Sequence, residues 1–216
     1  MTKIYLRIAK IKRISWFKIR SFFEKLKGIE TLKYVTLEEL GLSENEGIRY
    51  EPSKKKILHI AIKEIKEIVS LNNVAIIDLG CGKGRALIEL SKYPFRKIGG
   101  LEYSNDILNI CKNNLRKLKL WNIELFCMNV LDFKNYEEYD IYYFYNPFPQ
   151  PVFKKVLENL IENNKKNKKP IYIIYIYATC HSLIMKSGYF NLIKKIENEN
   201  KIFQQADDIY IYKNIN

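Results

Sequence analysis

A glycine-rich segment holds the residues with the clearest chemical potential in this sequence. Directly after an apolar run that contains Asp78, glycines stand at the alternate positions Gly80, Gly82 and Gly84. Glycine tolerates φ > 0 and lets the backbone approach a ligand closely. A dinucleotide-binding loop needs G-x-G-x-x-G, but Arg85 fills its last glycine position, and an adjacent acid repels phosphates. The segment therefore predicts a site for a ligand with a cationic or hydroxyl-rich end.

Two more acids follow predicted strands. Glu102 ends a strand at 97–102, and Asp132 follows a strand at 123–130. In an open parallel sheet, ligands bind beyond the carboxyl ends of the strands. There Glu102 can accept both hydroxyls of a ribose, and Asp132 can accept from an adenine amine. Taken singly, the glycines can be a plain turn, Glu102 a solvated strand end and Asp132 a helix cap. Their joint occurrence favours a binding site.

Strands that alternate with helices position these residues. Strands are predicted at residues 74–79, 97–102, 123–130, 141–145 and 171–177, with a final antiparallel pair at 190–196 and 209–212. Apolar residues at helical spacing predict helices between the strands, and one before them that Pro52 opens. This alternation indicates an α/β fold in which helices cover both faces of a mainly parallel sheet.

The composition limits the class of protein. A chain of 216 residues fits one α/β domain with an extension. No window is apolar enough for a transmembrane helix, and Lys10, Lys12 and Arg13 interrupt any apolar run that a secretory signal would need. Four scattered cysteines and two histidines predict no metal site. Reduced cysteines predict a cytoplasmic protein.

The net charge of +13 is concentrated at the N-terminus, where residues 1–27 hold nine Lys/Arg and one acid. We expect residues 1–47 to form a basic amphipathic helical extension. It has three interpretations: it docks on the rest of the chain and completes a pocket, it lies on an anionic membrane surface, or it binds nucleic acid or an acidic protein. Because the sequence has no nucleic-acid-binding module, nucleic acid is the least expected partner.

The pattern D-x-G-x-G-x-G at residues 78–84 resembles the first motif of the class I S-adenosylmethionine (AdoMet) methyltransferases. The resemblance covers residues 48–213 and implies that residues 48–216 form an AdoMet-binding methyltransferase domain. It implies a Rossmann-like, seven-stranded, mostly parallel sheet with helices on both faces and the last strand antiparallel. It also implies that the three glycines approach AdoMet, while Glu102 binds the ribose, Asp132 the adenine and Asp78 the methionine amino group.

A second motif, Asn146-Pro147-Phe148-Pro149, follows the predicted strand at 141–145. It resembles the N/D-P-P-Y/F element of amino-methyltransferases, although its aromatic residue comes one place early. The resemblance implies that the Asn146 side chain and the carbonyl after it accept from a target NH₂, with Pro147 and Phe148 completing the acceptor site. Such catalysis works by orientation of the reacting groups. The structural alternative is a rigid proline-rich turn.

The segment Tyr50-Glu51-Pro52-Ser53 resembles a stretch of protein-lysine methyltransferases that folds over the cofactor. Tyr50 and Ser53 are therefore predicted to contact AdoMet, unless Pro52 and Ser53 only start a helix. Bacterial methyltransferase-like proteins share this layout, but it supplies no substrate. The expected function is methyl transfer from AdoMet to an acceptor amine, with protein lysine first. The alternatives are a small-molecule or cell-surface glycan-precursor acceptor, or a non-catalytic module that binds AdoMet or nucleic acid.

Overall fold

The computed structural model describes residues 18–36, 38, 50–197 and 208–215, of which residues 18–26 form a helix. The longer elements that follow are the helices α3 (Lys55–Lys66), α4 (Arg85–Leu90), α5 (Asn105–Lys117), α6 (Gln150–Asn167) and α7 (His181–Lys186). The strands are β1 (Ala75–Leu79), β2 (Lys97–Glu102), β3 (Ile123–Cys127), β4 (Ile141–Tyr145), β5 (Tyr172–Ile176), β6 (Phe190–Ile196) and β7 (Ile209–Asn214).

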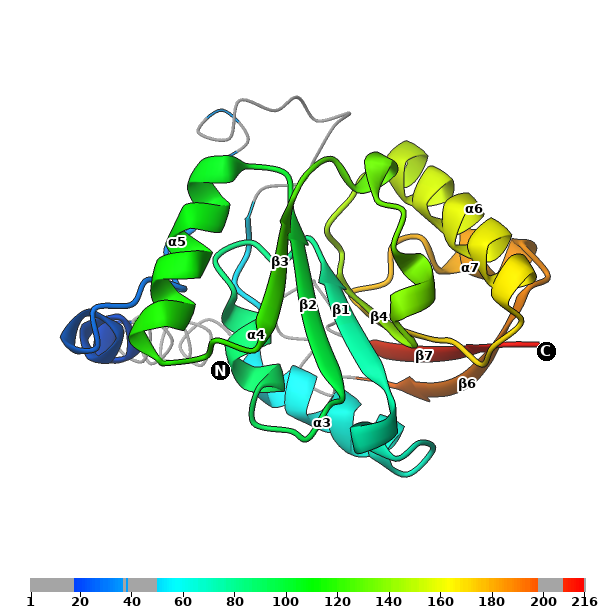
Figure 1. Cartoon of the computed structure of the whole chain (residues 1–216), viewed down its shortest axis with the longest axis horizontal. Coiled ribbons are helices and arrows are strands. Elements are labelled where there is room, and N and C mark those ends of the chain that lie inside the picture. Colours follow the sequence, from blue (N-terminus) through cyan, green and yellow to red (C-terminus); the bar gives the residue numbers. More distant parts are fainter. Residues whose placement is uncertain (1–17, 37, 39–49, 198–207, 216) are drawn as a thin grey trace, which may run out of the picture.

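The strands form one seven-stranded sheet in the order β3-β2-β1-β4-β5-β7-β6 (Figure 1). Strands β1 to β5 are parallel, and β7 runs antiparallel to both of its neighbours. The predicted Rossmann-like α/β sheet with an antiparallel last strand is therefore confirmed. The strand order reverses at β1, so the carboxyl ends of β2 and β4 flank the segment that follows β1.

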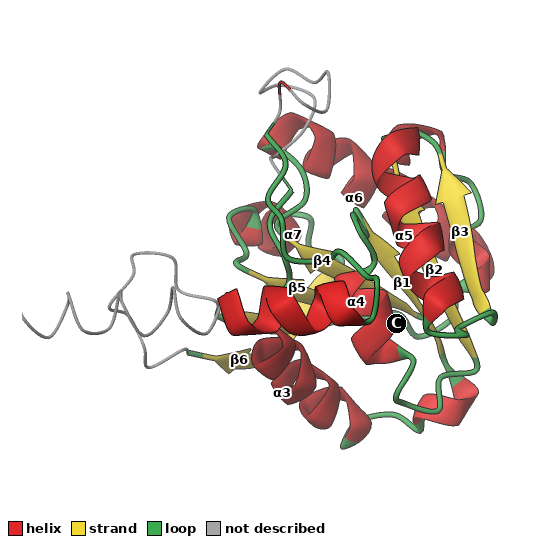
Figure 2. Ribbon diagram, turned by 90° about the vertical axis from the view of Figure 1, so that its left-hand side faces the viewer, coloured by secondary structure: helices red, strands yellow, loops and turns green. Residues whose placement is uncertain are grey.

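Helices cover both faces of the sheet (Figure 2). On one face a buried apolar cluster joins α3, α4 and α5 to the strands, and on the other face a second cluster joins α6 and α7 to them. Successive side chains of β1 point to opposite faces, so Ile76 packs in the first cluster and Ile77 in the second. Strand β1 is therefore buried along its whole length, including its one acid, Asp78.

Two local predictions differ from the structure, and one short helix was not predicted. Strand β3 stops at Cys127 instead of residue 130, because the Asn129 side chain accepts from the Leu131 N–H at 3.0 Å and starts a 3-10 turn. Helix α3 begins at Lys55 rather than at Pro52. Helix α7 was not predicted, since its six residues are too few to show a helical period.

Candidate functional site

The glycine-rich loop joins β1 to α4 and depends on the freedom of glycine. Gly80, Gly82 and Gly84 have φ of +102°, +52° and +80°. L side chains rarely adopt such angles. The N–H groups of Gly80 and Cys81 both donate to the carbonyl of Leu101 at 2.9 Å, which ties the loop to the end of β2. The predicted loop thus lies at the carboxyl edge of the sheet.

Glu102 connects this loop to the helix that follows β2. One oxygen of its carboxylate accepts from the Gly82 N–H at 3.0 Å, and the other accepts from the Ser104 N–H at 3.0 Å. Burial raises the pKa of Glu102, although these backbone donors act in the opposite direction. A half-buried carboxylate held in this way keeps further lone pairs that can accept ligand hydroxyls.

Asp78 is 3% exposed, and no described residue donates a hydrogen bond to its carboxylate. Burial, and next the charge of Glu102, raise the pKa of Asp78 from 3.8 to about 8. An acid in this state gains stability from any cation that enters the site, because the cation compensates the charge of the ionised carboxylate. Asp78 and Glu102 together form a site that favours a ligand with a positive charge and hydroxyl groups.

The turn after β4 lies against the glycine-rich loop. A Cβ built on Gly80 would come within 2.6 Å of the Pro147 Cβ, so only glycine admits this approach. Asn146 has φ of +41°, and its side-chain oxygen accepts from the Thr179 hydroxyl at 2.6 Å and from the Tyr175 hydroxyl at 3.3 Å. The hydroxyl groups thus fix the orientation of the Asn146 amide beside the loop.

Phe148 packs in the core. It is 9% exposed and lies edge-on to Phe144, with 6.4 Å between the ring centres. Its ring therefore offers no open face on which a planar substrate could stack. The aromatic residue that comes one place early in the sequence motif is thus a core residue in the structure.

The upstream segment touches the same loop. The Tyr50 ring lies over Gly82, where an added Cβ would come within 2.3 Å of a ring carbon. The Ser53 carbonyl accepts from Arg85 Nε at 2.9 Å. Asp132 is exposed in the turn after β3, and its carboxylate has no partner among the described residues. The structure therefore brings Tyr50 and Ser53 to the glycine-rich loop, whereas Asp132 shares only the edge of the sheet with it.

Comparison with known proteins identifies the family. The profile of a family described as "Methyltransferase domain" matches residues 70–212. The chain belongs to this methyltransferase family. The structure of a magnesium protoporphyrin IX methyltransferase from Synechocystis PCC 6803 with bound SAM has the same fold, with a TM-score of 0.58 and 12% identity over 74% of this chain and 79% of that chain. The chain is thus a class I AdoMet-dependent methyltransferase.

Two curated relatives match parts of the methyltransferase. A tRNA (guanine-N(7)-)-methyltransferase of Prochlorococcus marinus (strain NATL2A) is 31% identical over 147 residues, which are 61% of this chain and 64% of the relative. EEF1A lysine methyltransferase 2 of Danio rerio is 33% identical over 78 residues, which are 36% of this chain and 32% of the relative. The matched segments span less than two thirds of either relative.

The residues of the loop fit AdoMet, the cofactor of the family. AdoMet carries a cationic amino group and a ribose with two hydroxyls, and it supplies an electrophilic methyl group on a sulfonium. Asp78 is a buried carboxylate to which none of the described residues donates, so it suits the positive charge, and Glu102 has acceptor capacity for the hydroxyls. The glycines leave the backbone of the loop open to close approach. We keep the individual contacts to AdoMet as predictions.

Sequence reasoning missed an ionic network in which residues 24–35, which we call the strap, dock on the loop of the methyltransferase. Glu24 pairs with Arg85 at 2.8 Å, and Glu30 pairs with Lys83. Of the three interpretations of the extension, docking on the rest of the chain is what the described residues display. The contact is with the glycine-rich loop. The partners of each pair are far apart in the sequence, so no local pattern could have predicted these ion pairs.

The rest of the extension remains a prediction. Residues 1–17, 37 and 39–49 lie outside the described residues, so the predicted boundary between residues 47 and 48 is not tested. Helix 18–26 exposes four apolar side chains by 48–66%: Ile19, Phe22, Phe23 and Leu26. An anionic membrane surface and an acidic partner both stay predictions. In the described part of the chain no helix is long and apolar enough to cross a membrane.

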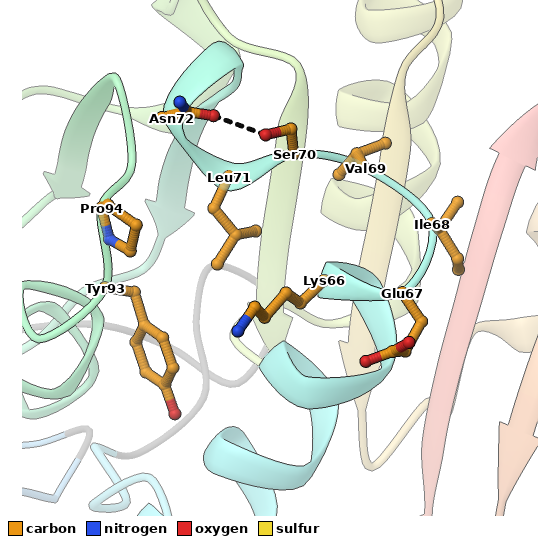
Figure 3. Close-up of a pocket in the computed structure, with 9 residues that line it drawn as sticks. All are labelled: Lys66, Glu67, Ile68, Val69, Ser70, Leu71, Asn72, Tyr93 and Pro94. Atoms are coloured by element: carbon orange, nitrogen blue, oxygen red, sulfur yellow. Dashed lines mark hydrogen bonds between the residues drawn. The ribbon is translucent and has the colours of Figure 1, made fainter.

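A separate cavity of about 560 Å³ lies at the opposite edge of the sheet (Figure 3). It is lined by the end of α3, the turn before β1 and the segment before β2, including Lys66, Leu71, Tyr93 and Pro94. None of the predicted site residues lines it. The cavity therefore plays no part in the assignment of the site.

Proposed function

We propose that this methyltransferase transfers the methyl group of AdoMet to a nitrogen atom of a macromolecular acceptor. The observation that carries the proposal is the close approach of Pro147 to Gly80, which places the Asn146-Pro147 turn beside the cofactor loop. An acceptor amine that donates to carbonyl oxygens of this turn would have its lone pair directed at the methyl group. Catalysis then comes from positioning.

Asn146 is the positioning group with the best-defined geometry. Its side-chain oxygen has two lone pairs, and hydroxyls at 2.6 Å and 3.3 Å engage them. The longer bond, from Tyr175, is the weaker one. An acceptor amine can replace the Tyr175 hydroxyl while the Thr179 hydroxyl keeps the amide in place. The backbone carbonyl of the same turn is the second acceptor in this arrangement.

Protein lysine is the acceptor that the turn supports best. A lysine amine needs acceptors and a narrow entry, whereas a nucleobase gains much of its binding from an aromatic face. Phe148, the aromatic residue of the motif, is buried against Phe144 and offers no such face. The partial similarity to EEF1A lysine methyltransferase 2 is consistent with this choice.

A base nitrogen of tRNA is the second candidate. The net charge of +13 suits a polyanion, and the match to a tRNA (guanine-N(7)-)-methyltransferase extends over 147 residues. The expectation that nucleic acid is the least expected partner is therefore unsupported. That expectation relied on the lack of a sequence module, but a chain with a net charge of +13 needs no separate module to attract RNA.

The test is methyl transfer from labelled AdoMet into a lysate of the source organism. Label that is acid-precipitable, sensitive to protease and resistant to nuclease supports lysine, and hydrolysis identifies the methylated residue. The reverse sensitivity supports RNA. Label that stays acid-soluble contradicts a macromolecular acceptor. It supports a small molecule or a glycan precursor as the acceptor instead.

Asn146→Ala tests the turn itself. We expect AdoMet affinity within about twofold of wild type and turnover lowered by at least tenfold, about 1.4 kcal/mol of transition-state stabilisation. Thr179→Val removes the hydroxyl that holds Asn146 and should lower turnover less. An Asn146→Ala variant with weakened AdoMet binding and unchanged turnover would make the turn structural.

A further inference from the structure

We propose that the strap, residues 24–35, is a positioning element for the AdoMet loop, so that docking of the strap and binding of AdoMet strengthen each other. The proposal relies on AdoMet binding at the loop and not on the identity of the acceptor. Three sets of contacts carry it: those of Arg85, those of Lys83 and those of Tyr50.

Arg85 is the centre of the first set. It is 5% exposed although it carries a full charge. Its guanidinium donates to Glu24 Oε1 at 2.8 Å, to the Thr31 hydroxyl at 2.7 Å and to the Ser53 carbonyl at 2.9 Å. The other Glu24 oxygen accepts from the Thr31 N–H at 2.7 Å. A buried charge is tolerated only when it is paired and hydrogen-bonded, so the strap supplies what Arg85 needs in order to stay buried.

Lys83 repeats this arrangement two residues earlier. It is 1% exposed and pairs with Glu30. Asn114 of α5 then joins strap and loop through the backbone: its amide nitrogen donates to the carbonyls of Glu30 and Lys83 at 2.9 Å, and its oxygen accepts from the Glu30 N–H at 2.8 Å. The buried Asn114 side chain thus hydrogen-bonds to the backbone of both the strap and the loop.

Tyr50 contacts both the strap and the loop. Its ring lies over Gly82, and its hydroxyl donates to the Thr31 carbonyl at 2.8 Å. Its N–H donates to the Val35 carbonyl at 3.0 Å, which fixes Tyr50 to the end of the strap. Burial, the largest influence, raises the pKa of this hydroxyl well above its usual range, so it donates at every physiological pH.

Gly82 links the strap contact to the predicted AdoMet site. The Gly82 N–H donates to Glu102, the predicted ribose acceptor, while the Tyr50 ring covers Gly82 from the strap side. A strap that leaves the loop would expose Lys83 and Arg85 and free the loop from its present shape. If AdoMet binds only the present shape, each of the two events must favour the other by the same factor.

The experiment measures both directions of this coupling in the full-length protein. Glu24→Gln keeps the shape of the side chain and removes its charge. We expect the AdoMet Kd, measured by calorimetry without an acceptor, to rise by about tenfold, equal to about 1.4 kcal/mol. The KM for AdoMet should rise with it, whereas kcat at saturating AdoMet should stay within twofold. Glu162→Gln, on an exposed residue of α6, is the matched control with no expected change.

The reciprocal readout uses the wild-type protein. The amides of Glu30, Thr31 and Tyr50 are hydrogen-bonded within the contact, so AdoMet should slow their hydrogen exchange. Equal AdoMet affinity of Glu24→Gln and Glu162→Gln would overturn the proposal, even if Glu24→Gln unfolds at a lower temperature. If Glu24→Gln does not fold, unchanged exchange of the three wild-type amides on addition of AdoMet overturns it as well. Neither result bears on the acceptor, because neither assay contains one.

Discussion

Replacement of Asp78 by Asn should stabilise the protein without AdoMet while it weakens AdoMet binding. Burial and the neighbouring charge of Glu102 raise the pKa of Asp78 from 3.8 to about 8. Between these two values the unfolded chain has lost the proton that the folded protein still holds. Unfolding then releases a proton, so the free energy of unfolding falls as the pH rises through this window.

The size of the effect follows from the same two values. At pH 7, about three pH units above the unfolded pKa of 3.8, the penalty is on the order of 4 kcal/mol at 1.4 kcal/mol per unit. Asn has nearly the same shape and no charge, so Asp78→Asn should recover much of this energy. At about 2–4 °C per kcal/mol for a chain of this size, the melting temperature should rise by roughly 10 °C at pH 7.

Thermal unfolding without AdoMet, at pH 7 and at pH 4, checks this expectation. At pH 4 the difference between Asp78→Asn and wild type should shrink to less than about 1 kcal/mol, because the folded protein holds the proton there and the unfolded carboxyl, with its pKa of 3.8, is only about half ionised. Asp132→Asn, at an exposed carboxylate, should match wild type at both pH values. Calorimetry at pH 7 should show AdoMet affinity of Asp78→Asn reduced by more than tenfold. A melting temperature that is unchanged or lower at pH 7 would refute the argument that burial and the charge of Glu102 disfavour the ionised form of this carboxylate.

Two further predictions concern other acids. Glu102→Ala should weaken AdoMet binding by more than tenfold, measured by calorimetry; unchanged affinity in this variant and in Asp78→Ala would refute the assignment of the site. Glu89, buried between α3 and α4, has its pKa lowered to about 2, since hydrogen bonds from Lys55, Lys92 and His59 outweigh the effect of burial. Glu89→Gln should therefore cost roughly 2 kcal/mol of stability at pH 7 in urea unfolding, and the difference from wild type should fade between pH 4.5 and pH 2.

The sequence predicted the sheet because its signals are local and repeated. The central parallel strands β1, β4 and β5 are covered on both faces and therefore appear as short apolar runs, such as Ile141–Tyr145, between helical patterns. The end of β3 was wrong, because a single side-chain hydrogen bond from Leu131 to Asn129 decides it. Propensity over a window of residues does not register one hydrogen bond.

The cofactor loop was predictable for a related reason. Asp78 and the three glycines lie within seven residues, and Glu102 is placed by the end of a strand. Parallel strands bring their carboxyl ends to one edge of the sheet, so Glu102 at the end of β2 lies close enough to accept from the Gly82 N–H. The place of Phe148 in the core was not predictable, because the same motif letters suit an exposed ring and a buried one.

The charge of the extension shows what a count of residues misses. Nine cations against one acid in residues 1–27 directed attention to partners outside the chain. The acid, Glu24, pairs with Arg85, which lies 61 positions later in the sequence at the start of α4, directly after the glycine-rich loop. An excess of one charge is spread over a surface and screened by solvent. The minority charge is the one that can meet a buried cation, so in a basic segment the rare acid is the better guide to how the segment docks on its own protein.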